Sequence, residues 1–159
     1  MDFKKQSIKT CVVACIIDDH DRVLLTRRCI EPFCSQWVMP GGRIDKGESI
    51  IAALHREVRE EVGLEIHVEK LIDVFEHLNV GDREDHYVIL YYRCTPTGGI
   101  LQPNGSECTE AIWAEQQELA AMVLPPGCRH ILGIVYPDLG WDVRLEQKDD
   151  IAAELPGDH

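Results

Sequence analysis

The sequence predicts an α/β (α+β) fold in which helices pack on a mixed β-sheet, within one domain that spans residues 1–145. Three observations indicate this fold. The 159 residues suffice for one sizeable hydrophobic core. Strand-like segments and helical segments alternate, but without the regular strand–helix–strand spacing of a doubly wound sheet. No internal repeat or linker divides the chain, and residues 146–159 are expected to form a loose acidic tail.

The chain is expected to begin with a β-hairpin. Ile8–Asp18 is rich in Val, Ile and Cys, a composition typical of a buried strand. Asp18–Asp21 is polar and predicts a turn, after which Arg22–Arg28 would return as the second strand. Cys29–Gln36 is then expected to be a loop, and Trp37–Met39 a short strand.

An amphipathic helix is expected from Ser49 to Val62. Pro40–Gly42 is a turn signal before it, because glycine allows backbone angles that other residues avoid and lets a ligand approach closely. Ser49 suits the N-cap and Gly63 the left-handed stop. Apolar residues recur at three- and four-residue steps and form a stripe: Ile51, Leu54, Val58 and Val62. The stripe predicts a face turned to the core.

The second half of the chain predicts further strands. Glu65–Leu78 reads as a strand that departs from strict alternation, and Asn79–Asp85 as a polar turn. His86–Cys94 has the highest β-branched and aromatic content in the chain and predicts a strand. Thr95–Ser106, with its prolines and glycines, is expected to be a loop, and Thr109–Ala114 a short strand.

Two helices are expected in the last third of the chain, before its acidic tail. Ala114–Met122 predicts a helix that Pro125–Gly127 would stop, and Cys128–Tyr136 predicts a second short helix.

Three carboxylates on the Ser49–Val62 helix point to metal chemistry. Glu57, Glu60 and Glu61 lie three and four residues apart, so they project from one helix face. Their mutual repulsion is relieved by a divalent cation, and carboxylate oxygens suit Mg²⁺ or Mn²⁺. Arg56 precedes Glu60 by four residues and can pair with it.

The stretch from Gly42 to Leu64 resembles the Nudix box, the signature of the Nudix hydrolases. Every fixed position of that signature is filled at the right spacing, by Gly42, Glu48, Arg56, Glu57, Val58, Glu60, Glu61, Gly63 and Leu64. Trp37, Pro40 and Gly41 before it also look like this family. The resemblance implies the Nudix fold, an α/β/α sandwich around a mixed sheet, with the box as a loop–helix–loop.

The resemblance also implies a metal-dependent pyrophosphohydrolase that cleaves a nucleoside diphosphate linked to some group X. By that similarity Glu57, Glu60 and Glu61, with the backbone of Gly42, would hold Mg²⁺ or Mn²⁺. The catalytic residues would be Glu60, Arg56 and Glu48, with Arg56 orienting the carboxylates. The general base stays open between Glu60 and the later acids Glu107 and Glu110, and His86 is a weaker candidate.

Substrate choice lies outside the box. The stretch RRCIEPFCSQWVMPGG resembles that of members acting on ADP-ribose and sugar nucleotides, which makes Arg28, Trp37 and Gly41 candidate substrate contacts, with Arg27 as an alternative to Arg28. Aromatic residues could stack on a base or belong to the core: Phe75, Tyr87 and Trp113. An oxidised nucleoside triphosphate is the competing substrate, and a non-catalytic Nudix-like nucleotide-sensing domain is the competing function.

The composition of the chain limits the classes of molecule that it is expected to bind. A net charge of −12 disfavours a nucleic-acid polymer but allows a small phosphorylated substrate bridged by metal. No apolar run approaches the roughly 18 residues that a membrane span needs, and the N-terminus carries no signal-peptide pattern. Seven cysteines without a CxxC pair favour reduced thiols over a zinc site or a disulfide framework. We therefore expect a cytoplasmic protein, for which a homodimer is compatible with the sequence.

Overall fold

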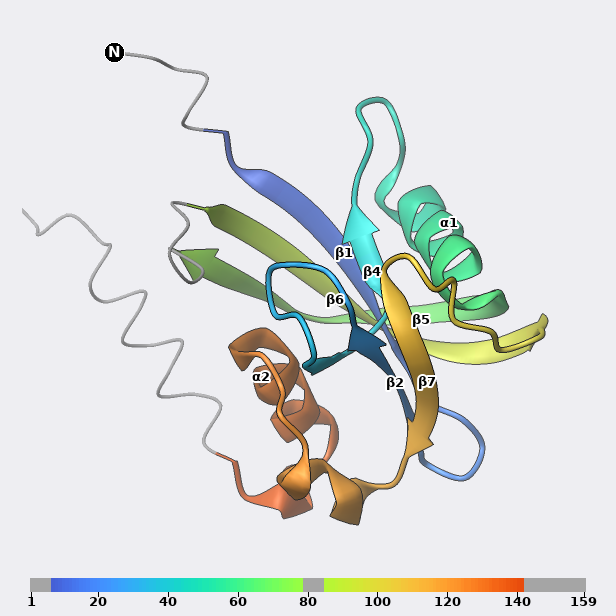
Figure 1. Ribbon diagram of the computed structural model, residues 1–159, viewed down its shortest axis with the longest axis vertical. Coiled ribbons are helices and arrows are strands. Elements are labelled where there is room, and N and C mark those ends of the chain that lie inside the picture. The colour runs from blue at the N-terminus through green and yellow to red at the C-terminus, as the bar shows by residue number, and fades with distance from the viewer. Residues whose placement is uncertain (1–6, 79–84, 142–159) are drawn as a thin grey trace, which may run out of the picture.

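The computed structural model describes residues 7–78 and 85–141 (Figure 1). The strands in chain order are β1 (Lys9–Ile16), β2 (Val23–Arg28), β3 (Trp37–Val38), β4 (Gly41–Arg43), β5 (Leu64–Leu78), β6 (His86–Gly99) and β7 (Cys108–Ala114). The helices are α1 (Ile50–Val62), the 3-10 helix η2 (Gln116–Ala121), α2 (Pro126–Val135) and the 3-10 helix η3 (Pro137–Leu139). No helix in this part of the chain is both long and apolar enough to cross a membrane.

The strands form two sheets. The larger has the order β4-β1-β6-β5 and is mixed, because β1 runs parallel to β6 while the other pairs are antiparallel. The smaller has the order β3-β2-β7 and is antiparallel. The predicted mixed sheet is therefore present, but a second sheet stands beside it.

The predicted hairpin between the first two strands is wrong. β1 is paired along both edges, by β4 and β6, so it has no free edge for β2. Among the described residues, the isolated bridge between Ile17 and Val23 and the hydrogen bond from the Asp18 N–H to the Arg22 carbonyl oxygen join the ends of the two segments. The turn itself is well built, because the Asp18 carboxylate accepts hydrogen bonds from the backbone N–H groups of His20 and Arg22.

The sheets form the middle layer between the two α-helices. Side chains alternate along β1, so that Val12, Ala14 and Ile16 pack with α1 while Cys15 packs with α2. On the other side of β1 the α2 core includes Ile131, Leu132, Phe75 and Tyr91. Figure 1 shows α1 and α2 on different sides of these strands. Each fully buried Val, Leu or Ile contributes about 1.5–3 kcal/mol, so these two cores set the rigid frame of the site.

Several predicted elements differ at their ends. β6 continues to Gly99, because β5 is long enough to pair with it there, so the first part of the predicted Thr95–Ser106 loop is strand. Gly41 and Gly42, predicted as part of a Pro40–Gly42 turn, pair with β1 in strand β4. The predicted Ala114–Met122 helix is only the 3-10 helix η2, since Leu119 is the one residue it buries. Helix α2 begins at Pro126, which suits the first turn because the proline lacks the N–H that is unpaired there.

Some predictions fall outside the described residues. The predicted polar turn at Asn79–Asp85 is described only at Asp85, and the predicted tail at 146–159 and the domain boundary at 145 are not described. All seven cysteines are described, and each is a free thiol.

Candidate active site

Helix α1 begins and ends at the predicted local signals. The Ser49 hydroxyl accepts a hydrogen bond from the Ala52 N–H at 3.1 Å, and Gly63 adopts a left-handed conformation with φ of 75°. The helix buries Ala53, Leu54, Val58 and Val62 completely. Ile51, expected in this stripe, is 41% exposed, because the buried face of the helix begins at Ala53. This rotation carries Glu57 and Glu61 to the buried flank of the helix.

Three carboxylates meet at this flank. Glu57, Glu61 and Glu107 each bring an oxygen within 4.8 Å of the others. Glu107 stands just before β7 and is brought to α1 by the fold rather than by sequence spacing. The predicted ligand Glu60 is outside this close cluster of described residues, although it lines the adjoining pocket, and its side chain is 57% exposed.

Burial makes this cluster electrostatically unfavourable without a cation. Glu61 is 4% exposed, and burial raises the pKa of its carboxyl to about 8, with the charges of Glu107 and Glu57 acting in the same direction. The Gly41 N–H opposes this shift by donating a hydrogen bond to Glu61 at 3.1 Å. Burial also raises the pKa of Glu57, against a hydrogen bond from Arg56. Three converging carboxylates of this kind fit a hard divalent cation.

Arg56 holds several carboxylates in place. Its Nε and Nη2 donate to the two oxygens of Glu48 at 2.6 and 2.9 Å, and its Nη1 donates to Glu57 at 2.8 Å and to Glu60 at 3.2 Å. The pairing with Glu60 was predicted from their spacing. The hydrogen bond from Arg56 lowers the pKa of Glu48. Glu48 therefore stays ionised and balances the positive charge of Arg56. Arg56 also donates to the Arg43 carbonyl oxygen at 3.1 Å, which ties α1 to β4.

The glycines of β4 lie so close to their neighbours that a side chain at either position would displace a neighbouring group. A Cβ on Gly42 would lie 2.4 Å from the Glu57 carboxyl carbon, and a Cβ on Gly41 would lie 2.3 Å from the Val12 carbonyl oxygen. The predicted reason, unusual backbone angles, applies at Gly47, which has φ of 87° and open space around its Cα. Because Gly41 and Gly42 have no side chains, the backbone of β4 lies directly against the carboxylates of Glu57 and Glu61.

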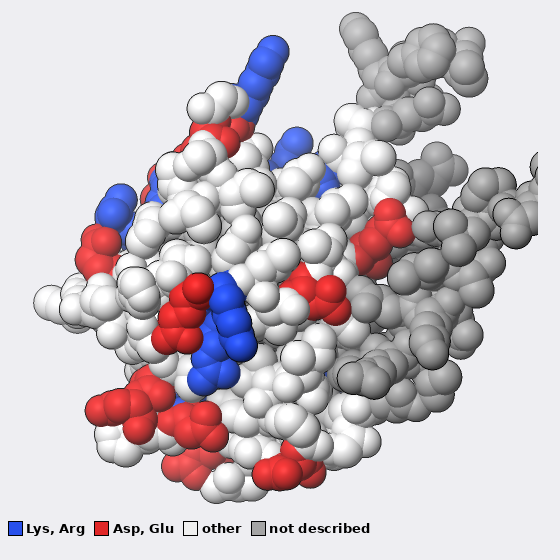
Figure 2. Space-filling model, turned by 180° about the vertical axis from the view of Figure 1, so that it is seen from behind, with Lys and Arg blue, Asp and Glu red and all other residues white. Residues whose placement is uncertain are grey.

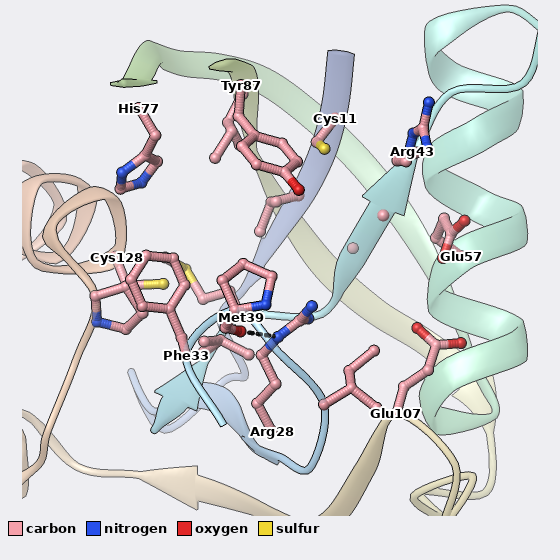
Figure 3. A pocket seen from close by; sticks show the side chains of 18 of the residues that line it. Cys11, Arg28, Phe33, Met39, Arg43, Glu57, His77, Tyr87, Glu107 and Cys128 are labelled. Carbon is pink, nitrogen blue, oxygen red and sulfur yellow. Dashed lines mark hydrogen bonds between the residues drawn. The ribbon is translucent and has the colours of Figure 1, made fainter. Parts of the chain in front are cut away.

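A pocket of about 410 Å³ extends from these carboxylates across the larger sheet. Figure 3 shows Glu57 and Glu107 at one end and Phe33, His77 and Cys128 at the other, with Arg28 between them. Among the described residues that line it, the cations are Arg28 and Arg43. The pocket therefore offers acidic groups at one end, a positive charge in the middle and an aromatic far end.

Arg28 also builds the wall of this pocket. Its Nε donates to the Pro32 carbonyl oxygen and its Nη2 to the Glu31 carbonyl oxygen at 3.5 Å. These bonds hold the loop that carries Phe33 against β2. Arg28 can therefore meet an anionic group while it positions the neighbouring aromatic ring.

Three residues predicted near the site lie elsewhere. Arg27 pairs with Glu110 at 3.3 Å and lies over the Trp37 ring at 6.0 Å from its centre. These three residues neighbour one another across β3, β2 and β7, and none of them lines the pocket. Strand alternation explains the difference, because Arg28 and Arg27 point to opposite sides of β2. Of the two later acids, Glu107 reaches the pocket and Glu110 does not.

The remaining candidates divide between core and pocket. Phe75 is buried in the core and Trp113 packs beside the α1 core, whereas Tyr87 lines the pocket. His86 bonds Glu76 at 2.6 Å and does not line the pocket.

Sequence reasoning missed Phe33 and His77. His77 is buried in phase with Phe75, two residues earlier on β5, and this alternation was a usable signal. Phe33 lies in an irregular loop with φ of 65°, for which the sequence carries no periodic signal.

Known proteins are similar to this chain in sequence and in fold. The NUDIX domain model matches residues 8–132. The human protein named 8-oxo-dGDP phosphatase NUDT18 is 30% identical over 131 residues, which cover 82% of this chain but 39% of that protein. The ADP-ribose pyrophosphatase of Methanocaldococcus jannaschii is 31% identical over 96 residues, covering 60% of this chain and 56% of the relative. A MutT NUDIX hydrolase structure from Burkholderia pseudomallei has a TM-score of 0.72 at 26% identity, covering 82% of this chain and 99% of that one.

The matched region contains the whole of α1 and every carboxylate of the cluster, including Glu107 from the segment before β7. The fold, the box helix and the matched family model agree, and the chain belongs to the Nudix family.

Proposed function

We propose that this protein is a metal-dependent pyrophosphohydrolase that cleaves the diphosphate linkage of a nucleoside diphosphate joined to a further group. The observation that carries the proposal is the convergence of Glu57, Glu61 and Glu107 within 4.8 Å at one end of a pocket with an aromatic far end. Such a pocket suits a substrate that is anionic at one end and planar at the other.

Mg²⁺ or Mn²⁺ is the cofactor that these residues fit. Glu57, Glu61 and Glu107 would hold it, because carboxylate oxygens are the ligands that hard divalent ions prefer. When bound, the ion neutralises phosphate charge and makes a coordinated water more acidic. Gly42 leaves the Glu57 carboxylate room at the edge of β4, and Gly41 fixes Glu61 through its N–H.

Glu60 is the general base that the geometry favours. Its Oε2 accepts a hydrogen bond from Arg56, its side chain is 57% exposed, and it lines the pocket without being part of the buried cluster. Its Oε1 is therefore the atom that would take a proton from the attacking water. Arg56 holds Glu60 and Glu57 at fixed positions, and Glu48 anchors Arg56 through two charge-assisted bonds. In this role Arg56 and Glu48 position the reacting groups.

Arg28 and Arg43 would meet the phosphates that extend from the cluster. The sequence favoured ADP-ribose or a sugar nucleotide, with an oxidised nucleoside triphosphate as the alternative. One relative is named for ADP-ribose and another for 8-oxo-dGDP, which supports a small nucleotide and leaves the group X to experiment.

The surface supports a compact substrate over a nucleic-acid polymer. Figure 2, seen from behind Figure 1, shows acidic side chains spread over that face, with several of them along its lower edge. With a net charge of −12, each further phosphate outside the metal cluster adds repulsion. We propose a cytoplasmic enzyme acting on free nucleotides without a membrane, and a homodimer remains a prediction of the sequence.

Hydrolysis with and without metal tests the function. Purified protein with Mg²⁺ should release a nucleoside monophosphate from at least one of ADP-ribose, 8-oxo-dGDP and 8-oxo-dGTP, and excess chelator should abolish the reaction until Mg²⁺ or Mn²⁺ is restored. Full turnover in chelator would reject the metal-dependent mechanism. Tight nucleotide binding without any turnover would instead support the nucleotide-sensing alternative.

A further inference from the structure

The far end of the pocket has one polar side chain without a hydrogen-bond partner. His77 is 9% exposed and lines the pocket, and no hydrogen bond to its ring occurs in the described structure. Of the neighbouring hydroxyl groups, that of Tyr87 accepts a hydrogen bond from Lys9 at 3.5 Å, and Tyr91 is buried with Cys128 in the α2 core. The ring nitrogens of His77 are therefore the polar groups at this end that a ligand in the pocket can hydrogen-bond.

The surroundings of His77 are aromatic. Its ring centre lies 5.7 Å from that of Phe33 and 4.7 Å from that of Phe75, and both pairs are tilted. Figure 3 shows His77 and Phe33 turned toward the same end of the pocket. Burial lowers the pKa of His77, so the ring is neutral at pH 7 and carries no positive charge to attract a phosphate. An apolar, aromatic end with a neutral imidazole suits a nucleobase better than a ribose, whose hydroxyls would each need a partner.

Helix α2 begins at the same end. Pro125 and Cys128 line the pocket, and Gly127 packs so closely that a Cβ there would lie 3.0 Å from His77 Nε2. The first N–H groups of a helix lack acceptors within it and give that end a partial positive charge. A carbonyl oxygen is favoured in this field, whereas an amino group would bring its positive hydrogens toward it.

We propose that the far end of the pocket binds a nucleobase by a carbonyl-bearing edge, which the N-terminal field of α2 favours and to which the His77 ring donates a hydrogen bond. The inference rests on the proposed function, because the phosphates must lie at the carboxylate end for the base to reach His77. It ranks guanine and hypoxanthine nucleotides above adenine nucleotides, and so ranks guanosine derivatives above the ADP-ribose that the sequence favoured.

Binding of reaction products tests this without turnover. Hypoxanthine differs from adenine by a carbonyl in place of the 6-amino group, so IMP and AMP form a matched pair, with GMP and ribose 5-phosphate as further ligands. Calorimetric titration with Mg²⁺ present should give IMP and GMP at least about tenfold tighter binding than AMP, since an unpaired polar group in the site discriminates strongly. Ribose 5-phosphate should bind more weakly than all three.

Variants at His77 connect the preference to the residue. His77→Leu should reduce the IMP-to-AMP preference to within about threefold, and His77→Gln, which keeps a donor and an acceptor, should retain part of it. His20→Leu, in the exposed turn after β1, is the control and should leave the preference unchanged. Thermal unfolding of each variant verifies that it is folded.

The unaltered protein is enough to decide the question if a variant does not fold. Equal or tighter binding of AMP, binding of ribose 5-phosphate as tight as that of GMP, or no binding of any monophosphate would overturn the inference. Hydrolysis of a nucleotide by the same preparation would then leave the proposed function standing. Failure of hydrolysis with the IMP preference intact would reject the function and keep the base site.

Discussion

Replacing Gly42 by alanine is the sharpest test of the carboxylate cluster. The added Cβ would lie 2.4 Å from the Glu57 carboxyl carbon, whereas ordinary van der Waals contact begins at 3.4 Å. Glu57 must therefore move by about 1 Å, and Arg56, which bonds it at 2.8 Å, opposes that movement. A misplacement of this size in a reacting group costs on the order of a hundredfold in rate. We expect Gly42→Ala to lower kcat about a hundredfold.

Gly47→Ala is the matched control. Gly47 has φ of 87° and nothing within 4 Å of its added Cβ, so alanine there strains the backbone without touching the carboxylates. The strain costs about 1–2 kcal/mol, comparable to the roughly 1–3 kcal/mol for overpacking at Gly42. Both variants should lose a few degrees in Tm, at about 2–4 °C per kcal/mol. Only Gly42→Ala should lose activity.

Initial rates and Mg²⁺-dependent Tm provide the assay. A cation at one hundred times its Kd stabilises the native state by about 2.7 kcal/mol, and Gly42→Ala should lose most of that gain while Gly47→Ala keeps it. If Gly42→Ala keeps its rate within threefold, Glu57 is not held where the chemistry needs it. If Gly47→Ala loses as much activity as Gly42→Ala, the loss reflects stability and the reasoning fails.

Other predictions use pairs of neighbouring residues. Glu107→Gln should lower kcat at least tenfold because Glu107 lies in the cluster, whereas Glu110→Gln should leave it within twofold; equal effects in steady-state kinetics would contradict this geometry. Arg28→Ala should lower kcat/KM about tenfold by freeing the loop and removing a phosphate contact, while Arg27→Ala, whose side chain lies outside the pocket, should not. Glu60→Gln should lower kcat at least a hundredfold with little change in Tm, and retention of a third of the parent rate would exclude Glu60 as the base.

Local sequence signals predicted the box helix well. The N-cap Ser49, the left-handed Gly63 and the pairing of Arg56 with Glu60 depend on residues within a few turns of one another, so spacing is sufficient to predict them. The same spacing could not predict which of the helix carboxylates would be buried. Glu57 and Glu61 are buried and Glu60 is exposed because of the way α1 packs on β1, which is a property of the tertiary fold.

The pocket itself depends on long-range pairing. Parallel pairing of β1 with β6 puts Cys11 beside Ile89, and β5 then brings His77 to the same sheet face. The hairpin was the natural prediction for two consecutive strands, and it failed because β4 and β6 already occupy the edges of β1. Arg28 is an example of what the sequence could not predict. Its positive charge was visible in the sequence, but its hydrogen bond to the Pro32 carbonyl oxygen was not.

Glu61 ties stability to the metal and provides a last test. Glu61 is 4% exposed and lies among the carboxylates of Glu57 and Glu107, and in the described structure its carboxyl accepts one hydrogen bond, from the Gly41 N–H. Glu61→Gln keeps an oxygen for that N–H and cannot ionise, so without a cation it avoids the free-energy cost of protonating or burying the charge of this carboxyl on folding. In chelator we expect the variant to unfold at a Tm a few degrees above that of the parent protein. With saturating Mg²⁺ the order should reverse, because the parent gains the binding free energy of the ion and the variant loses a ligand. Thermal unfolding in both buffers measures the crossing, and Tm values that keep one order in both would show that Glu61 does not hold the ion.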